Sequence, residues 1–392
     1  MSRGVQSSPE PRPLDAKGVH SPIHDRARPI APAYEAMARM GLPMLVELDT
    51  PPESPSMPRE HFSPAAAVVS PSTIVRFEPS KLKVGALLGK GAFCEVCVVT
   101  SSLLGDQRAV LKRVRSDIID EQRKKMAHRD LAHESALFAR MAPHPHIVRV
   151  LGMHADGDRI DYLVLEHIYE SFATVYDRWQ RHRGMLCCSL ETAESIGKLC
   201  CGAAPGASSW RRLWASRLRA ARDLASALAH LHTTAVPGFR VAYRDLKPAN
   251  LGFDYGRLVL YDFGLAKLIP KPSAVVMGDF ASLRMSAETG SPRYMAPEVA
   301  LAKHYDEGCD VYSFGMLLWQ LCALALPFAA YSGAAFHARV VVGGERLPLP
   351  AQWPQRISRL INRCWAENPA SRPTCDAAVV ELEEQITTFS LP

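Results

Sequence analysis

The hydrophobic pattern of this chain changes once, near residue 170, and this change restricts the fold more than any other feature. Before it, short Val- and Leu-rich segments alternate with turn residues, which is typical of strands. After it, apolar residues recur at spacings of three and four, as in amphipathic helices. We therefore expect an α+β fold, in which a small strand-rich lobe precedes a larger, mainly helical lobe.

The first lobe is predicted to contain five strands and one helix. Residues 81–102 predict a strand, a turn and a second strand, and residues 107–115 a third strand. Residues 116–141 lack Gly and Pro and predict the helix, and residues 146–155 and 159–168 predict the last two strands. In the second lobe, one amphipathic helix is marked by Trp214, Leu218, Ala221, Leu224, Leu228 and Leu231.

Residues 1–75 form a different kind of segment, which is rich in proline and serine. Ser-Pro or Thr-Pro pairs begin at Ser8, Ser21, Thr50, Ser54, Ser63 and Ser70. Such a segment buries too little apolar surface to offset its ordering entropy, so we predict a disordered tail. It is either a regulatory tail for proline-directed phosphorylation or a plain linker.

The overall composition, 47% hydrophobic and 22% charged, is typical of a soluble globular protein. A net charge of +6 is too small to indicate a nucleic-acid partner, and ten scattered or paired cysteines indicate reduced thiols. The N-terminus lacks the apolar core of a secretory signal. The apolar stretch 314–330 is short, so we expect a buried helix rather than a membrane span. These features favour a cytoplasmic location, and the nucleus remains an alternative.

Three polar features stand out in the first lobe. Gly89 and Gly91 lie in the turn between two predicted strands, where a bare backbone can approach phosphate oxygens, although many hairpins contain two such glycines. Lys112 ends an apolar strand and Glu134 lies on the predicted helix, both ordinary places for exposed charges. If both side chains are buried, they must form a pair, because a lone buried charge is costly.

The second lobe opens with "VAYRDLKPANLGFD", residues 241–254. In this stretch Asp245 can accept a proton, Lys247 can neutralise an anionic group, and Asn250 offers an oxygen ligand. Asp262 follows an apolar segment 12 residues after Asn250, and amide and carboxylate oxygens together suit Mg²⁺. This set supplies the positioning and charge neutralisation that phosphoryl transfer requires.

These residues belong to a longer series of motifs that resembles the eukaryotic protein kinases over residues 80–388. In order, the motifs are "GKGAFCEV", "AVLK", "HES", "HPHIVRVLG", "LVLEHI", "YRDLKPAN", "DFG", "APE", "DVYSFG" and "CWAENPASRP". The resemblance implies a bilobal protein kinase fold, with an N-lobe at 80–166 and a C-lobe at 169–388. It also implies an enzyme that uses ATP and Mg²⁺ and acts on a protein substrate.

The resemblance assigns catalytic roles residue by residue. Lys112 holds the ATP phosphates and pairs with Glu134, Asp245 is the catalytic base, and Lys247 steadies the γ-phosphate. The implied metal ligands are Asn250 and Asp262.

The implied nucleotide-binding residues are Leu88, Gly89, Lys90, Gly91, Val96, Ala109, Lys112, Leu165, Glu166 and Ile168. Among them, Leu165 is the gatekeeper, and the backbones of Glu166 and Ile168 hydrogen-bond adenine beneath Val96 and Ala109. Two structural features are also implied. These are a salt bridge of Glu298 with Arg372 and an inter-lobe stack of Phe138, Val150, Tyr243 and Phe263.

The chain departs from the family pattern at three positions. Cys94 replaces the third glycine of the lid, and Tyr243 replaces the usual histidine, where a ring still fills the stack. Gly252 stands where the family usually has an apolar side chain under adenine. We expect this glycine to leave a gap beneath the base and to weaken nucleotide binding by roughly 1–2 kcal/mol.

Cysteines raise two further hypotheses. Residues 184–209 form an insertion with two Cys-Cys pairs, which lack the spacing of a zinc site and favour a loose loop. Cys94 and Cys97 have C-x-x-C spacing, but on an alternating strand they are more simply two ordinary thiols. A reactive Cys94 over the ATP site is the alternative.

Other features resemble the serine/threonine kinases, in particular their tyrosine-kinase-like branch. These are Lys247, Ser291 and the phrases "DVYSFGMLLWQL" and "CWAENPASRPT". In the family, an arginine placed like Arg244 often receives a phosphate from the activation segment, here residues 262–298. An upstream kinase acting on Ser286 or Thr289 is therefore expected to switch the enzyme on.

Two other functions remain open. Cys94 and Gly252 also fit a pseudokinase scaffold with weak nucleotide binding, although every catalytic residue is present. A dual-specificity kinase, which also phosphorylates tyrosine, is the second alternative.

Overall fold

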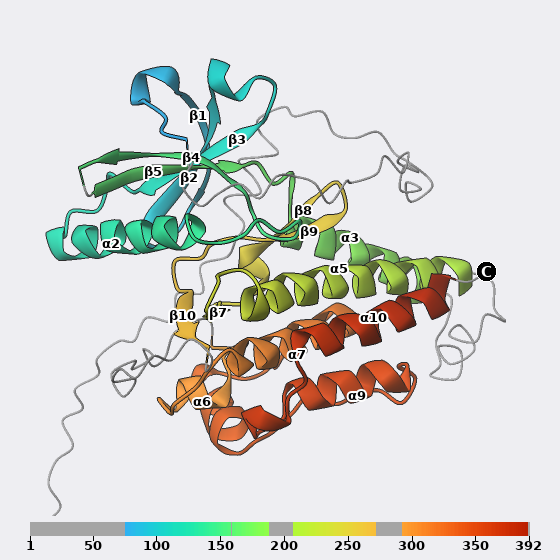
Figure 1. Ribbon diagram of the computed structural model, residues 1–392. Helices are drawn as coiled ribbons and strands as arrows, with labels where there is room; N and C mark the ends of the chain where they lie inside the picture. Colours follow the sequence, from blue (N-terminus) through green and yellow to red (C-terminus); the bar gives the residue numbers. More distant parts are fainter. Residues whose placement is uncertain (1–74, 158, 188–206, 272–291, 391–392) are drawn as a thin grey trace, which may run out of the picture. The chain divides into compact units, whose positions relative to one another are not determined.

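The computed structural model describes residues 75–157, 159–187, 207–271 and 292–390. The elements of the first lobe are β1 Lys83–Lys90, β2 Cys94–Thr100, β3 Ala109–Val114, α2 Glu121–Phe138, β4 Val150–Asp156 and β5 Arg159–Glu166. The strands form one antiparallel sheet in the order β1-β2-β3-β5-β4, and α2 packs beside it (Figure 1). The predicted five strands and their helix are therefore confirmed.

The two faces of this sheet bury different cores, because successive side chains of a strand point to opposite faces. Val110 and Leu165 belong to the large core that continues into the second lobe, whereas their neighbours Leu111 and Val164 belong to a smaller one. The smaller core also includes Phe77, Val99, Ala109 and Tyr162.

Helix α2 is shorter than its predicted range. It begins after Asp120, whose carboxylate accepts hydrogen bonds from the backbone N–H groups of Gln122 and Arg123. This N-cap satisfies donors that the first helical turn leaves free, so the residues from 116 to 120 stay outside the helix. At the C-terminal end of the helix, the backbone N–H of Met141 donates a hydrogen bond to the carbonyl of Leu137 at 3.1 Å.

The second lobe is mainly helical, as predicted. Its elements are β6 Glu170–Ser171, α3 Phe172–Cys187, α5 Ala207–Thr233, β7 Phe239–Ala242, β8 Leu251–Asp254, β9 Arg257–Leu260, β10 Lys267–Pro270, α6 Pro297–Ala300, α7 Gly308–Ala323, α8 Gly333–Phe336, α9 Gln355–Cys364 and α10 Cys375–Ser390. The short strands form two small sheets, β6-β8-β9 and β10-β7.

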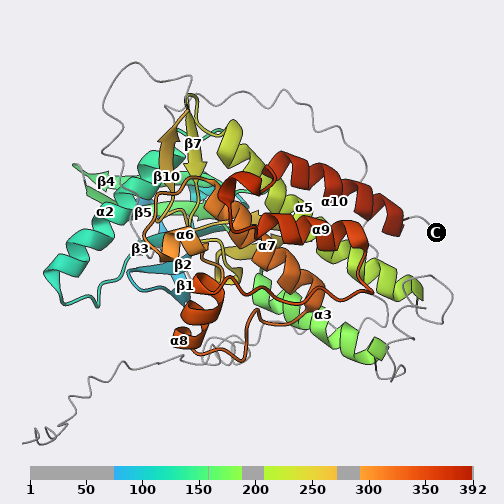
Figure 2. The same ribbon diagram turned by 90° about the horizontal axis from the view of Figure 1, so that it is seen from below.

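Helix α5 lies at the centre of this lobe. All six apolar residues that predicted it are buried, from Trp214 to Leu231. Helix α10 runs alongside α5 in both ribbon views (Figures 1 and 2). The apolar stripe of α5 therefore forms the main wall of the core.

Helix α7 carries the apolar stretch that began at residue 314, and nearly all of its side chains are buried. It ends at Ala323 rather than near residue 330, because Leu324 adopts a left-handed conformation with φ of 50°. Within the described residues, no helix combines the length and the apolar character that a membrane crossing requires.

Two short loops bring the polar residues of the second lobe together. Residues 243–250 connect β7 to β8, and residues 261–266 connect β9 to β10. The β8–β9 hairpin places their ends side by side, and the backbone N–H of Tyr261 donates to the carbonyl of Asn250 at 3.1 Å. Hairpin pairing therefore joins Asn250 to the loop that contains Asp262.

Candidate active site

The glycine-rich turn between β1 and β2 is held by a cluster of charges. Arg115 Nη1 donates to the carbonyl of Gly91 at 2.9 Å, and Asp117 accepts from both Arg115 and Lys90. Neither Gly89 nor Gly91 has a positive φ, so the backbone conformation of the turn does not require glycine. What glycine provides here is a backbone without a side chain. Sequence reasoning missed this contact with the loop after β3.

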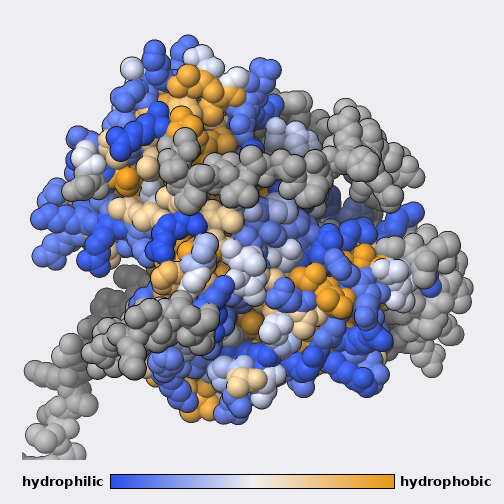
Figure 3. All heavy atoms as spheres, in the orientation of Figure 1, coloured by the Kyte–Doolittle hydropathy of each residue, from blue (hydrophilic) through white to orange (hydrophobic). Residues whose placement is uncertain are grey.

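Strand β1, which leads into this turn, is exposed along its whole length. Its apolar residues Val84, Leu87 and Leu88 are between 42% and 47% exposed. Apolar surface is visible on the sheet of the first lobe in Figure 3. Leu88 and the turn therefore lie at the accessible edge of the sheet, as expected for a lid.

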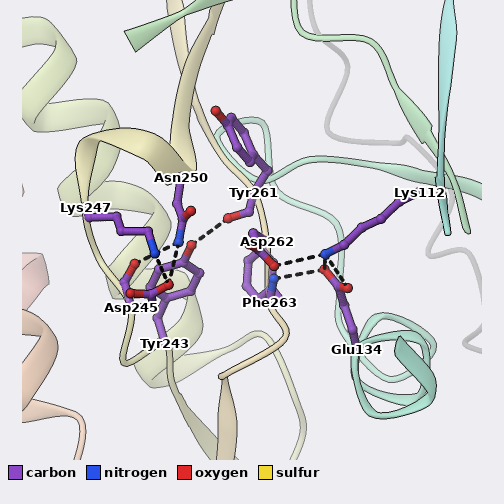
Figure 4. Close-up of polar contacts among 9 residues, drawn as sticks. All are labelled: Lys112, Glu134, Tyr243, Asp245, Lys247, Asn250, Tyr261, Asp262 and Phe263. Atoms are coloured by element: carbon purple, nitrogen blue, oxygen red, sulfur yellow. Dashed lines mark hydrogen bonds and ion pairs between the residues drawn. The ribbon is translucent and has the colours of Figure 1, made fainter. Parts of the chain in front are cut away.

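Lys112 connects the two lobes. Its Nζ lies 2.6 Å from Oε2 of Glu134 on α2 and 2.9 Å from Oδ1 of Asp262 (Figure 4). Glu134 also accepts a hydrogen bond from the backbone N–H of Phe263 at 3.0 Å. Since Lys112 and Glu134 are both buried, they form the pair that the sequence required.

The charges in this cluster shift one another's pKa. Burial alone would lower the pKa of Lys112, but Glu134 and Asp262 raise it above its ordinary value. Burial would likewise raise the pKa of Asp262, but Lys112 lowers it. Both shifts favour the ionised forms, so the ammonium and the carboxylate stay charged at neutral pH.

Asp245, Lys247 and Asn250 form a second polar cluster. Lys247 Nζ lies 2.6 Å from Oδ2 of Asp245, and Asn250 Nδ2 donates to Asp245 Oδ2 at 3.1 Å and to its carbonyl at 2.9 Å. Oδ1 of Asp245 is buried and has no hydrogen-bond partner among the described residues. A buried carboxylate oxygen of this kind is an acceptor that a bound hydroxyl could satisfy.

The backbone before Asp245 is fixed by Asp310 on α7. Asp310 accepts hydrogen bonds from the backbone N–H groups of Tyr243 and Arg244, each at 2.7 Å. Its third partner is Nε2 of His232, at 3.0 Å. Arg244 has a φ of 71°, a costly conformation that these bonds help to maintain. The motif "DVYSFG" contains Asp310, but sequence reasoning assigned it no role.

Aromatic rings continue from one lobe to the other. The ring of Phe263 lies 5.1 Å from that of Phe138 on α2 and 5.2 Å from that of Tyr243, measured between centroids. Val150 is partly buried against the same core. The aromatic part of the predicted stack is confirmed, and the Tyr243 hydroxyl extends it by donating to the carbonyl of Tyr261.

The predicted nucleotide-binding residues of the sheet lie on neighbouring strands. In the sheet register, Leu165 on β5 is opposite Val110 and Val150, while Ala109 is opposite Glu166. Val96 on β2 is opposite Lys112 on β3. The hinge is held in place by Glu166, whose carboxylate accepts from Arg149. The sheet therefore gathers Val96, Leu165 and Lys112 on one face, together with Val110. Ala109 faces the smaller core on the other side of the sheet, so its predicted place above adenine was wrong, because successive residues of a strand point to opposite faces.

The predicted gap at Gly252 is absent. A Cβ at this position would lie 2.6 Å from Cγ2 of Ile168 and 3.2 Å from Cε1 of Tyr261. The backbone carbonyl of Glu170, at 3.0 Å, also crowds this point, so the place of a side chain at 252 is already enclosed by its neighbours. The expectation of an open gap was wrong because it considered position 252 without its neighbours.

The hypotheses about Cys94 and Cys97 are resolved by β2. The strand buries Cys97 on the opposite face from Cys94, so the two thiols do not form one site. Burial raises the pKa of Cys94 to about 11, which keeps the thiol protonated and disfavours a reactive Cys94. Within the described ranges, no cluster of three or more His, Cys, Asp or Glu residues suits a metal ion.

The predicted salt bridge of the second lobe is confirmed. Arg372 Nη2 lies 2.9 Å from Oε2 of Glu298, and both side chains are buried. The predicted insertion, residues 184–209, is described only at its ends, where α3 continues to Cys187 and α5 begins at Ala207. Several other predictions fall outside the described residues: the tail to residue 74, the cysteines Cys188, Cys200 and Cys201, and the activation-segment residues Ser286, Thr289 and Ser291.

This arrangement of two lobes, a glycine-rich turn and two polar clusters defines a protein kinase domain. The family described as "Protein tyrosine and serine/threonine kinase" matches residues 82–382, so the chain belongs to this family. The resemblance drawn from the motifs is thereby confirmed.

Curated relatives support the same assignment. The chain is 37% identical over 172 residues to the dual specificity protein kinase shkC of Dictyostelium discoideum. This alignment covers 43% of this chain and 32% of the relative. It is 34% identical over 172 residues to the serine/threonine-protein kinase STY17 of Arabidopsis thaliana, with coverage of 44% and 27%. A putative mitogen-activated protein kinase kinase kinase 7-like protein of Drosophila melanogaster is 28% identical over 281 residues, with coverage of 69% and 58%. The alignments thus span less than two thirds of each relative.

Proposed function

We propose that this chain is an active protein serine/threonine kinase that transfers the γ-phosphate of ATP to Ser or Thr hydroxyls of a protein. The observation that carries this proposal is Lys112, which contacts Glu134 and Asp262 at the same time. This contact requires α2 and the loop after β9 to be in place together, as phosphoryl transfer in kinases demands.

The residues present fit ATP and Mg²⁺. Asn250 and Asp262 would hold the metal through hard oxygen atoms, and Lys112 would hold the phosphates. When bound, Mg²⁺ supplies charge neutralisation for the phosphate oxygens. The backbones of Glu166 and Ile168 would bind adenine, with Val96 above it.

The chemistry of this chain's own residues follows from the second polar cluster. Asp245 would orient the substrate hydroxyl through Oδ1 and accept its proton, while Lys247 would remain on Oδ2 and face the transferred group. The substrate oxygen then forms a bond to the γ-phosphorus as the bond to the β–γ bridging oxygen breaks, and ADP leaves.

We also propose that phosphorylation of Ser286 or Thr289 by an upstream kinase activates the enzyme. Arg244 lies next to Asp245, and its guanidinium contacts the carbonyl of Leu265 and the hydroxyl of Tyr305. A phosphate reaching this arginine would order the activation segment by charge-assisted hydrogen bonds. The cytoplasm remains the proposed location, and a protein the proposed substrate.

Dual specificity is the second candidate, because two of the relatives are named a dual specificity protein kinase and a serine/threonine/tyrosine-protein kinase. The pseudokinase scaffold is the third, and the charges gathered around Lys112 argue against it. Phosphoamino-acid analysis of the autophosphorylated protein separates the first two candidates.

The test of the leading proposal is phosphate transfer from labelled ATP with Mg²⁺ by the purified wild type and Asp245→Asn, each alone and with a generic basic protein. We expect label on serine or threonine from the wild type, and a loss of at least about 10²-fold in the variant. If the wild type is silent even with a phosphorylated activation segment, the scaffold becomes the better proposal.

A further inference from the structure

Arg115, which follows β3, holds the glycine-rich turn between β1 and β2. Its guanidinium Nη1 donates to the carbonyl of Gly91 at 2.9 Å and to the carbonyl of Ala92 at 3.5 Å. Its backbone N–H donates to the carbonyl of Phe93 at 3.0 Å. Three successive carbonyls of the turn therefore bond to one arginine, to which the kinase motifs assign no role.

A neighbouring carboxylate fixes the orientation of this guanidinium. Asp117 accepts from Nε of Arg115 at 2.8 Å and from its Nη2 at 2.9 Å, so the ion pair is bidentate. The same carboxylate accepts from Nζ of Lys90, in the turn, at 3.2 Å. The planar fork of an arginine can bond the carboxylate and the turn at the same time, whereas the single nitrogen of a lysine cannot reproduce this geometry.

The bonds to the turn determine the direction of two backbone N–H groups. In a planar trans peptide, the N–H of a residue points opposite to the carbonyl of the residue before it. Because the carbonyls of Gly91 and Ala92 point to Arg115, the N–H groups of Ala92 and Phe93 point away from it. Neither of these N–H groups donates to an acceptor within the described part of the chain, so both are available to a ligand.

The chemistry of such a ligand follows from these N–H groups. Adjacent backbone N–H groups that are free to donate form a concave site for an anion such as a phosphate oxygen. Under the proposed function, the turn covers the nucleotide phosphates that Lys112 holds. Arg115 would then act on the phosphates through the turn, because its own bonds are to the carbonyl side of the same peptides.

We propose that Arg115 is a positioning residue for phosphate binding: it holds the carbonyls of the glycine-rich turn so that the N–H groups of Ala92 and Phe93 are presented to the nucleotide phosphates. This inference rests on the proposed function, because it needs a nucleotide under the turn. The arginine gives the turn an orientation that its glycines do not impose, since neither Gly89 nor Gly91 has a positive φ. A turn that is ordered before the nucleotide arrives lowers the cost of binding.

Calorimetric titration of the purified full chain tests this role. ADP with Mg²⁺ should bind about five- to tenfold more weakly to Arg115→Ala than to the wild type, because the turn is no longer held in its binding orientation. Adenosine has no phosphates, so its affinity for the two proteins should agree within about twofold. A general loosening of the first lobe would instead weaken both ligands alike.

Two further variants separate geometry from charge. Arg115→Lys keeps the positive charge but loses the fork, so it should lose about as much ADP affinity as Arg115→Ala. Asp117→Ala removes a negative charge, which by itself would strengthen the binding of an anion. Because it also releases Arg115, we expect it to weaken ADP binding about two- to threefold. Wild-type affinity in Arg115→Lys, or tighter binding by Asp117→Ala, would show that charge alone acts and would overturn the inference.

Arg113→Ala is the matched control. Arg113 lies on β3, two residues before Arg115, and its Nε pairs with Glu95 at 2.8 Å rather than with the turn. This variant loses the same kind of side chain and the same charge, and it should bind ADP within about twofold of the wild type. Equal losses of ADP affinity in Arg113→Ala and Arg115→Ala would contradict a specific role of Arg115.

The remaining outcomes are also decisive. Unchanged ADP affinity in Arg115→Ala, or equal losses for ADP and adenosine, would rule out the positioning role. Should Arg115→Ala fail to give a cooperative thermal transition, Arg115→Met, which keeps an apolar stem, takes its place with the same expectation. If the wild type binds no ADP, the proposed function fails and this inference fails with it. If the wild type binds ADP and transfers phosphate but Arg115→Ala matches it, only the inference fails.

Discussion

At the scale of single residues, the chemistry of this chain depends on charges that are stable only in combination. Lys112 is 9% exposed and would be costly to bury alone, but two carboxylates share its ammonium group. The same contact that compensates the burial also brings α2 to Asp262. Lys112 can therefore stay buried and charged only when Glu134 on α2 and Asp262 are both in place beside it.

Glu134→Gln tests this requirement. The amide keeps the shape of the side chain but removes the charge that raises the pKa of Lys112. We expect kcat/KM to fall roughly 10²-fold, which corresponds to about 2.7 kcal/mol of transition-state stabilisation. The measurement is steady-state phosphate transfer to a generic protein substrate.

Glu95→Gln is the matched control for that variant. Glu95 is also a buried carboxylate, and it pairs with Arg113 on the neighbouring strand at 2.8 Å, outside the two polar clusters. It should lose stability with little change in kcat/KM. An equal loss of activity in both variants would mean that the effect of Glu134 is not specific to Lys112.

Sequence spacing was sufficient to identify the polar residues of both clusters, because each occupies a fixed place in a motif. It was not sufficient for Gly252 and Tyr261. A departure at one position is interpretable only with its spatial neighbours, and Ile168 lies 84 positions from Gly252 along the chain (252 − 168). Packing of this kind has no signal in a single sequence.

At the scale of elements, the loop before Asp245 is fixed by helices α5 and α7. Asp310 on α7 accepts two backbone N–H groups of this loop and contacts His232 on α5. Burial would lower the pKa of His232, but Cys375 and Asp310 beside it raise the pKa to about 10. The imidazole is therefore protonated in the folded state at neutral pH.

This raised pKa predicts a pH dependence of stability. The unfolded chain releases the proton near its ordinary pKa of 6.5, so the His232–Asp310 contact stabilises the fold fully below that pH. The contribution is lost as the pH rises toward about 10. The difference in unfolding free energy between wild type and His232→Gln, measured by denaturant titration, should therefore shrink between pH 6.5 and 10. A difference that stays constant over this range would contradict the charged pair.

The activation segment gives the second prediction at this scale. Replacing Ser286 and Thr289 together by Ala should lower phosphate transfer at least about tenfold, because no phosphate would then reach Arg244. Phosphatase treatment of the wild type should produce a similar loss and leave the variant unchanged. Full activity of the wild type with an unphosphorylated segment, verified by mass spectrometry, would rule out this switch.

Element boundaries depended on local details that periodicity does not contain. Helix α2 was predicted over 116–141, but the Asp120 cap delays its start. The apolar run extends to residue 330, but α7 ends at Ala323, before the left-handed Leu324. Hydrophobicity alone could not predict this end. The existence and type of the first-lobe elements, and of α5 and α7, were predictable because they follow from the pattern of burial, whereas the short strands from β6 to β10 were not predicted.

At the scale of the whole kinase domain, the lobes are joined by backbone as well as side chains. The segment between α2 and β4 pairs with β9: the N–H of Val148 donates to the carbonyl of Leu260, and the N–H of Leu260 to the carbonyl of His146, both at 2.9 Å. The rings of Phe138 and Phe263 meet next to this connection. The second lobe and α2 are thus joined by packed side chains as well as by backbone hydrogen bonds.

Phe138→Ala should test the aromatic connection. Because Phe138 is partly buried, we expect a loss of about 1–3 kcal/mol in unfolding free energy. We also expect kcat/KM to fall when it is measured well below the melting temperature, where nearly all of the variant is still folded. The loss of stability would not explain this fall, whereas the lost contact between α2 and Phe263 would.

Phe389→Ala is the control for Phe138→Ala. Phe389 packs on Trp214 at 6.1 Å between centroids, within the helices of the second lobe. It should destabilise the fold while leaving kcat/KM unchanged at the same temperature. Parallel losses of activity in the two variants would show that general loosening, rather than the aromatic connection, controls the rate.

The crowding around Gly252 also restricts the order in which such a sequence can evolve. A side chain at 252 and the present position of Ile168 exclude one another, because Cγ2 of Ile168 lies 2.6 Å from the place of a Cβ. In a lineage that began with an apolar residue at 252, its loss had to precede or accompany the present placement of Ile168. With Ile168 in this place, reversion at 252 alone passes through a steric clash, so the two positions are inherited as a unit.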